Sequence, residues 1–307
     1  MDVFTLVSGD FVYGAAALCN SLRAAKFEGA IHVGYMGELE WTIHPSAPII
    51  VHRLDADGKW MGNHKPNFIM DHASGTYSYI DADCIITTST FIEAVREAVL
   101  RRPVFCAEAI ISRNDIRRLR WRAAKERSLG LPQDAGGSAL LGTSDMYYNS
   151  GFFSGDVRRD RWLLEGWRKI IETSLRGSGA LYESPDFPFA DQDCLNALIQ
   201  DESTQFYCVS PPDVWFPFMS SAFFHIGTHG SALLHCAGGE KPWRHSTVRP
   251  RAPHIYERAW YHFLFEDAGW VQCRPFVKGS LKSWFQDEKW GRGIAHAKRL
   301  AKQVLRG

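Results

Sequence analysis

The sequence of 307 residues carries 35 basic and 34 acidic residues, which gives a net charge of +1. Hydrophobic residues make up 45% and charged residues 22%, and this composition excludes a disordered chain, a collagen-like repeat and a coiled coil. A chain so close to neutral also lacks the broad basic surface that nucleic acid attracts, so we expect no nucleic acid partner.

The seven cysteines predict neither a disulfide framework nor a zinc site. Their number is odd and no C-x-x-C pair occurs, so a reducing compartment fits them better. The first residues, MDVFTLVS, contain no basic region, and their apolar run is shorter than that of a signal peptide. No apolar stretch reaches the roughly 18 residues of a spanning helix. We therefore expect a cytoplasmic protein.

Short apolar strands alternate with helices in the first hundred residues, a pattern typical of crossover units and a mostly parallel sheet. In such sheets ligands bind at the carboxyl ends of the strands, so we expect the chemistry just after each apolar run. The predicted strands are 3–7, 31–35, 49–53, 77–80, 84–86 and 103–107, and the predicted helices are 14–25, 65–73 and 90–101.

The second half of the chain continues this pattern less regularly. A basic stretch, 113–127, predicts a helix, and a glycine-rich segment after it predicts a flexible loop. A further strand is expected over 146–157. Helices are expected over 160–175, where apolar residues recur at helical spacing, and over 191–200, where acidic residues favour a helix start.

Two carboxylates, Asp81 and Asp83, interrupt the apolar run 77–86. Burying two like charges side by side costs several kcal/mol unless a cation compensates them. In an extended strand, residues i and i+2 point the same way, so both carboxylates could bind one hard divalent ion. The alternative is a turn with two solvated aspartates, which the flanking apolar residues disfavour.

A second polar cluster follows the apolar pair Leu233 and Leu234. His235 ends this predicted strand, and a neutral imidazole can complete the ligand shell of Mg²⁺ or Mn²⁺. Gly238 lets backbone amides approach an anion closely, and Lys241 supplies a point charge that suits a phosphate. The alternative is a core histidine beside a loop.

Four motifs in this order resemble glycosyltransferase family 8. They are the D-x-D of Asp81-Ala82-Asp83, the N-x-G of Asn149-Ser150-Gly151, the D-Q of Asp191-Gln192 and the H-x-x-G-x-x-K-P-W of His235 to Trp243. The resemblance covers roughly residues 3–245. Within the family, the chain is similar to bacterial lipopolysaccharide galactosyl- and glucosyltransferases and, at its N-terminus, to glycogenin.

This resemblance implies an α/β fold of the GT-A type, with a Rossmann-like, mixed and mostly parallel sheet flanked by helices. The implied glycosyltransferase domain is 1–270, and 112–145 forms a variable insertion on its acceptor side. Residues 271–307 are expected to form a basic amphipathic, helical C-terminal tail.

The resemblance also implies a role for each matching residue. Asp81, Asp83 and His235 match metal ligands, with Asp81 also near the ribose, and the aromatic that stacks on uracil is either Phe11 or Tyr13. The other matching positions are Leu6, Val7 and Ser8 at the nucleobase, Asn149, Asp191 and Lys65 at the donor sugar, Gln192 beneath the anomeric carbon, and Gly238 and Lys241 at the diphosphate.

These features predict a metal-dependent retaining glycosyltransferase of cell-surface polysaccharide synthesis. Its donor is a UDP-sugar, its acceptor a glycan or glycolipid, and its cofactor Mn²⁺ or Mg²⁺. Retention is implied by the resemblance alone: Gln192 is a poor nucleophile, which favours same-face attack, and Asp191 is the alternative nucleophile of a covalent route. The alternatives are a sugar-nucleotide-binding protein and a sugar nucleotidyltransferase. A nucleotidyltransferase requires a basic residue in the loop after the first strand, and the segment VSGDFVYG at 7–14 lacks one.

Two basic segments predict further contacts. Residues 289–306 read as an amphipathic helix that suits an anionic membrane surface, which would make the protein peripheral on the inner face of the membrane. The alternative is a solvated helix packed on the body. The stretch 113–127 either binds an anionic acceptor or is simply an exposed helix.

Overall fold

The structure is a computed structural model, and all statements below concern the residues it describes. These are 1–55, 60–110, 115–131, 145–175, 187–200, 206–209, 213–215, 231–238, 241–244 and 255–273.

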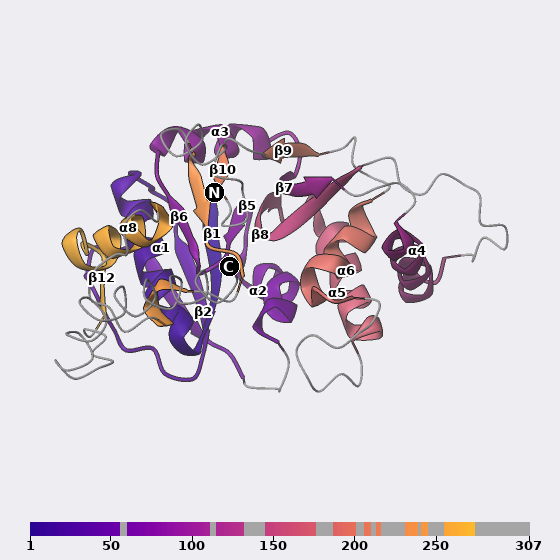
Figure 1. Cartoon of the computed structure of the whole chain (residues 1–307), viewed down its shortest axis with the longest axis horizontal. Coiled ribbons are helices and arrows are strands. Elements are labelled where there is room, and N and C mark those ends of the chain that lie inside the picture. The colour runs from indigo at the N-terminus through magenta and orange to yellow at the C-terminus, as the bar shows by residue number, and fades with distance from the viewer. Residues whose placement is uncertain are drawn as a thin grey trace, which may run out of the picture.

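A seven-stranded sheet with the order β4-β2-β1-β5-β8-β7-β9 forms the centre of the molecule (Figure 1). The pairs β1–β2, β1–β5, β2–β4 and β7–β9 are parallel, whereas β8 runs antiparallel to both of its neighbours. The predicted mixed, mostly parallel α/β architecture is therefore confirmed. The strands are β1 (Asp2–Ser8), β2 (Ile31–Met36), β4 (Ile49–Arg53), β5 (Thr76–Ile80), β7 (Val104–Ile110), β8 (Met146–Asp156) and β9 (Tyr207–Val209).

Helices cover both faces of this sheet, and the alternation of side chains along β1 shows how. Val3 and Val7 point into one core, and Phe4 and Leu6 point into the other, as the period of two in a strand requires. The first core is closed by α1 (Val12–Ala24), α3 (Ser89–Val99) and α8 (Ile255–Tyr261). The second is closed by α2 (Lys65–His72), α4 (Ile116–Leu129), α5 (Arg161–Ser174) and α6 (Ala190–Ile199).

Two smaller sheets extend the first core. In one, β11 (Leu233–His235) lies between β10 (Val214–Trp215) and β6 (Cys84–Ile86); in the other, β3 (Trp41–Ile43) pairs with β12 (Val271–Cys273). The sequence analysis did not predict β3, β9, β10, β12 or α8. All four of these strands span only two or three residues, and so short a segment contains too few residues for a clear periodic pattern.

The elements that were predicted agree with the structure to within a few residues, including the helix of the basic stretch, which is α4. Short 3₁₀ segments at 9–11, 61–64 and 242–244 and a π-helix at 262–266 complete the described elements. The expected tail 271–307 lies outside the described residues except for Val271–Cys273, and the predicted loop after α4 lies outside them too. None of the described helices combines the length and apolarity needed to span a bilayer.

Candidate active site

The turn between β5 and β6 carries Asp81 and Asp83. The prediction of one extended strand here is wrong, because β5 pairs with β1 and β8 whereas β6 pairs with β11 in a different sheet. The Cys84 N–H donates to the Asp81 carbonyl at 3.0 Å and so closes the turn. The two carboxylates nevertheless face a common partner, because one oxygen of each lies within 4.0 Å of His235 Nε2.

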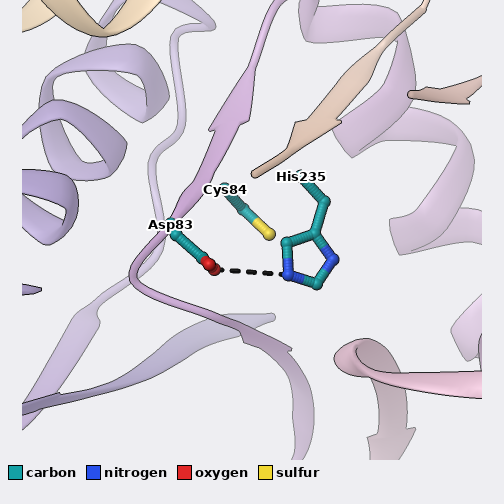
Figure 2. Close-up of side chains that lie close together, drawn as sticks. All are labelled: Asp83, Cys84 and His235. Atoms are coloured by element: carbon teal, nitrogen blue, oxygen red, sulfur yellow. Dashed lines mark ion pairs between the residues drawn. The ribbon is translucent and has the colours of Figure 1, made fainter. Parts of the chain in front are cut away.

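Strand β11 brings His235 to this turn. Antiparallel pairing sets His235 opposite Cys84, and the Cys236 N–H donates to the Asp83 carbonyl at 3.0 Å beyond the strand end. His235 Nε2 then lies 3.3 Å from Asp83 Oδ1 and 4.0 Å from Asp81 Oδ2. Figure 2 shows the imidazole of His235 facing the Asp83 carboxylate. Two segments that are distant in the sequence therefore meet at one point.

Gly151 of β8 leaves the space in which these groups meet. A Cβ at this position would overlap the His235 ring and would lie 2.7 Å from both Asp81 Oδ2 and Asn149 Oδ1. Real Cβ atoms do not approach other heavy atoms so closely, so only glycine fits here without a shift of the neighbouring groups. The glycine of the N-x-G motif is thus explained by close packing.

Two buried lysines face the carboxylates. Lys241 Nζ, whose side chain is 3% exposed, bonds to Asp83 Oδ2 and to the Cys236 carbonyl. Lys65 Nζ, at the start of α2, lies 2.9 Å from Asp191 Oδ2 and 3.2 Å from Asp81 Oδ1. Each carboxylate of the turn therefore has its own cation.

Burial and the two lysines shift the pKa values of the aspartates in opposite directions. Burial raises the pKa of Asp81 above its ordinary value, although Lys65 opposes the rise. Burial would also raise the pKa of Asp83, but Lys241 and His235 hold it well below its usual range. Burial disfavours the charged form of Lys65, yet Asp191 and Asp81 hold its pKa above its ordinary value.

Carboxylate oxygens are the ligands that hard cations such as Mn²⁺ and Mg²⁺ prefer, and Asp83 offers one 3.3 Å from His235 Nε2. Asp81 Oδ2 lies at the edge of this pair, 4.0 Å from the same nitrogen. In the part of the chain that the structure describes, one group of three candidate ligand atoms lies within 4.8 Å, formed by Asp83, Cys84 and His235. Burial raises the pKa of the Cys84 thiol well above its ordinary value, and Sγ contacts the Gly151 carbonyl at 3.8 Å. Cys84 is therefore a packing residue beside the site.

The N-x-G and D-Q motifs are joined by direct hydrogen bonds. Ser150 Oγ donates to Asp191 Oδ2 at 2.9 Å, and the Ser150 N–H donates to Gln192 Oε1 at 3.1 Å. The Gly151 N–H donates to Asn149 Oδ1 at 2.7 Å. Because Lys65 contacts both Asp191 and Asp81, this second group of residues is continuous with the turn.

Glu108 of β7 also belongs to this group, although the sequence analysis did not single it out. Its Oε2 accepts hydrogen bonds from Asn149 Nδ2 at 2.7 Å and from Gln192 Nε2 at 3.0 Å. The signal was present, since Glu108 directly follows the apolar run 103–107, where chemistry was expected.

The K-P-W segment is fixed to the first helix through Trp243. Its indole is fully buried, and it lies so close to Gly14 of α1 that a Cβ there would come within 2.6 Å of the ring. Phe11 packs edge-on against Trp243, with ring centroids 5.6 Å apart, and Lys241 Nζ lies 5.4 Å from the Phe11 ring centre. Trp243 therefore positions the segment that carries Lys241.

A cavity of about 480 Å³ lies at the carboxyl ends of β1 and β2, with Tyr13 and Gly9 in its wall. Of the two aromatics left open by the sequence, Tyr13 lines this cavity and Phe11 packs beneath Lys241. The Leu6 and Val7 side chains are buried in the two cores, so their side chains are not available to a nucleobase, whereas Ser8 is partly exposed. Gly238 adopts a positive φ of 98°, a conformation that favours glycine.

The fold is similar to those of several solved structures. An active-site mutant of LgtC matches with a TM-score of 0.55 and 15% identity over 90% of this chain and 98% of that one. This chain shares its fold with LgtC. The galactosyltransferase LgtC in complex with donor and acceptor sugar analogues matches with a TM-score of 0.52 at 14% identity, over 90% and 98% of the two chains. The bifunctional glycosyltransferase WbbM matches with a TM-score of 0.50 at 11% identity, over 79% and 46%.

The sequence comparisons are weaker. No known family profile matches the chain. General stress protein A of Bacillus subtilis (strain 168) is 28% identical over 131 residues, which is 38% of this chain and 41% of that protein. The comparisons therefore support the GT-A architecture.

Proposed function

We propose that this protein is a divalent-metal-dependent retaining glycosyltransferase that transfers a hexose from a UDP-sugar to a glycan or glycolipid acceptor. One observation carries the proposal: Asp81, Asp83 and His235 converge at the carboxyl end of β5, inside a fold that is similar to LgtC. Ligands of open α/β sheets bind at this edge. A cation there would stabilise the charge that the diphosphate gains as it leaves.

The residues of the candidate site form two groups, one for the metal and the diphosphate and one for the donor sugar. Asp81, Asp83 and His235 would hold the metal, which when bound would neutralise charge on the departing diphosphate. Lys241 is a buried point charge beside Asp83, and Gly238, three residues before it, has a positive φ; both features support a role of this segment at the diphosphate. Asn149, Asp191 and Gln192 form the group that would hold the donor sugar.

The proposed course of the reaction is same-face attack, in which the departing phosphate takes the acceptor proton. Asp191 supports this assignment, because its carboxylate already pairs with Lys65 and accepts from Ser150 Oγ. A carboxylate with these two partners is a weak nucleophile. Gln192 contributes an amide, whose oxygen favours a cation-like anomeric carbon without forming a bond to it.

A UDP-sugar screen tests the function directly. The full chain is incubated with each donor and Mn²⁺ or Mg²⁺, and UDP release is measured with and without acceptors. We expect metal-dependent UDP release from one donor and its loss when the metal is chelated. UDP binding without release from any donor would favour the binding-protein alternative. Absence of UDP binding would overturn the proposal.

We also propose that the basic C-terminal segment binds an anionic membrane, where a glycolipid acceptor would lie. The support is the sequence pattern of 289–306, which lies outside the described residues. The full chain and a variant without 285–307 are sedimented with phosphatidylserine-containing vesicles. We expect only the full chain to sediment, and equal sedimentation of both would refute the anchor.

A further inference from the structure

Strand β7 contains an irregularity at Glu108. Its pairing with β8 sets Ala107 opposite Tyr148 and Ala109 opposite Tyr147, so Glu108 has no residue opposite it. An extra residue of this kind is a β-bulge, which commonly turns a side chain out of the regular pleat. The bulge accounts for a carboxylate inside a strand whose preceding residues, 103–107, are buried.

One oxygen of Glu108 accepts from two amides. Oε2 takes hydrogen bonds from Asn149 Nδ2 at 2.7 Å and from Gln192 Nε2 at 3.0 Å. No ion pair of Glu108 occurs among the described residues, in contrast to Asp81, Asp83 and Asp191. The contacts of Glu108 are therefore directed to the two amides rather than to a cation.

These contacts determine whether the NH₂ group or the oxygen of the Asn149 and Gln192 amides faces Glu108. A carboxylate only accepts, so each amide must present its NH₂ group to Glu108. Independently, the Ser150 N–H donates to Gln192 Oε1 and the Gly151 N–H donates to Asn149 Oδ1. Both sets of partners select the same orientation, and the side chain of Gln192 is further held by a hydrogen bond to the Tyr147 side chain.

We propose that Glu108 is a positioning residue that holds the Asn149 and Gln192 amides in the orientation that the donor sugar requires. The role of the two amides at the donor sugar rests on the proposed function, whereas their orientation by Glu108 does not. Glu108 is a third residue, on a different strand, through which their geometry is set. A displaced amide lowers a rate steeply, since a misplacement of about 1 Å costs about 100-fold.

The first test follows the amides themselves and needs no substrate. ¹H–¹⁵N spectra of the full chain are recorded for the wild type, Glu108→Ala, Glu108→Gln and the control Glu165→Ala, which removes an exposed glutamate of α5. Gln192→Ala and Asn149→Ala assign the two NH₂ signals. We expect Glu108→Ala to shift both signals and to speed their exchange with water about tenfold or more. Unchanged signals in Glu108→Ala would overturn the inference, whatever the activity.

The second test separates positioning from general damage. With the donor found in the screen, we expect Glu108→Ala to lower kcat by about 10- to 100-fold and to leave KM within about threefold. Glu108→Gln still offers an acceptor oxygen, so it should recover most of kcat. UDP affinity measured by calorimetry with Mn²⁺ should remain unchanged in both variants. A loss of UDP affinity as large as the loss of kcat, or no recovery in Glu108→Gln, would overturn the positioning role.

These outcomes are distinct from failure of the proposed function. If the wild type neither binds UDP nor releases it from any donor, the proposed function falls and with it the assignment of the two amides to a sugar. The amide spectra still decide whether Glu108 orients Asn149 and Gln192.

Discussion

His235 Nε2 lies 3.3 Å from Asp83 Oδ1, although His235 ends β11 and Asp83 lies far earlier in the chain, in the turn before β6. The pairing of β11 with β6 brings them together, because it sets His235 opposite Cys84. An imidazole and a carboxylate at this distance need only small movements to share one cation at the usual ligand distances of about 2.0–2.2 Å.

Replacement of Asp83 by asparagine should remove metal-dependent nucleotide binding. Asparagine keeps the size of the side chain but loses the charge that Lys241 contacts and that would bind a divalent ion. We expect UDP affinity in the presence of Mn²⁺ to fall about 100-fold, or about 2.7 kcal/mol, by isothermal titration calorimetry. Asp71→Asn, at an exposed position of α2, is the control and should bind like the wild type. Equal affinity in Asp83→Asn would exclude Asp83 from the site.

Replacement of His235 by alanine should weaken Mn²⁺ binding by at least about tenfold, because even residues that only support a ligand contribute that much. The chain should stay folded, which far-ultraviolet circular dichroism and thermal unfolding check. Mn²⁺ binding is measured by electron paramagnetic resonance of the free ion. A wild-type titration curve in the variant would show that His235 is not a ligand.

Gly151→Ala should damage both stability and the metal site. The added methyl group would overlap the His235 ring and crowd Asp81, so one of them must move. We expect a loss of about 1–3 kcal/mol in urea unfolding, together with weaker Mn²⁺ binding. Gly75→Ala is the matched control, because a Cβ there meets no atom within 4 Å, and its stability should change by less than about 1 kcal/mol. Similar results for the two variants would contradict the packing argument.

Stability should fall in mild acid because of three stacked histidines on the second face of the sheet. His32 Nδ1 lies 3.0 Å from His52 Nε2, and the His52 and His72 rings are 3.9 Å apart. Burial and the two neighbouring rings lower the pKa of His52 to about 4, and burial lowers the pKa of His32 although Asp2 opposes it. Phe4 and Phe68, which also pack here, carry no charge.

The sign follows from linkage. Below the ordinary histidine pKa of about 6.5, His52 is protonated in the unfolded chain but stays neutral in the folded protein until the pH approaches 4. The free energy of unfolding is therefore highest above about pH 6.5 and decreases as the pH falls toward 4. Urea unfolding of the wild type and His52→Phe between pH 7.5 and 5 checks this. The variant should lose less stability over this range, and an equal or steeper loss would contradict the assignment.

The sequence was sufficient for the parts of the fold that have a periodic pattern. The strands that end at Ser8, Met36 and Ile80 and the helices between them were predicted because long apolar runs alternate with amphipathic segments. The antiparallel β11 was predicted only as a strand, since its partner is set by tertiary contacts. The turn at Asp81 was read as strand because β5 and β6 are both apolar and only their different partners separate them.

The candidate site was predictable where its residue types are unusual for their surroundings. The charged residues Asp81 and Asp83 interrupt an apolar run, and Lys241 follows a glycine-rich segment; the structure brings them within contact of one another or of His235. The hydrogen bonds of Glu108 were not predictable, because they depend on a bulge in β7 that leaves no mark in the residue pattern. The partners of Lys65 depend in the same way on tertiary contacts, because α2 packs against α5 and β5 and the 3₁₀ segment before it packs against α6.

Three consecutive residues of β8 serve three different neighbours. Asn149 contacts Glu108 of β7, and Ser150 contacts Lys65 and Asp191. Gly151 has no Cβ and so leaves room for the His235 ring. A slip of one residue in this strand would exchange its two faces and would separate the residues around His235 and those around Asp191 at the same moment. Opening of β8 is therefore an all-or-none event for the whole site, and amide exchange along the strand should report one shared opening free energy rather than separate ones.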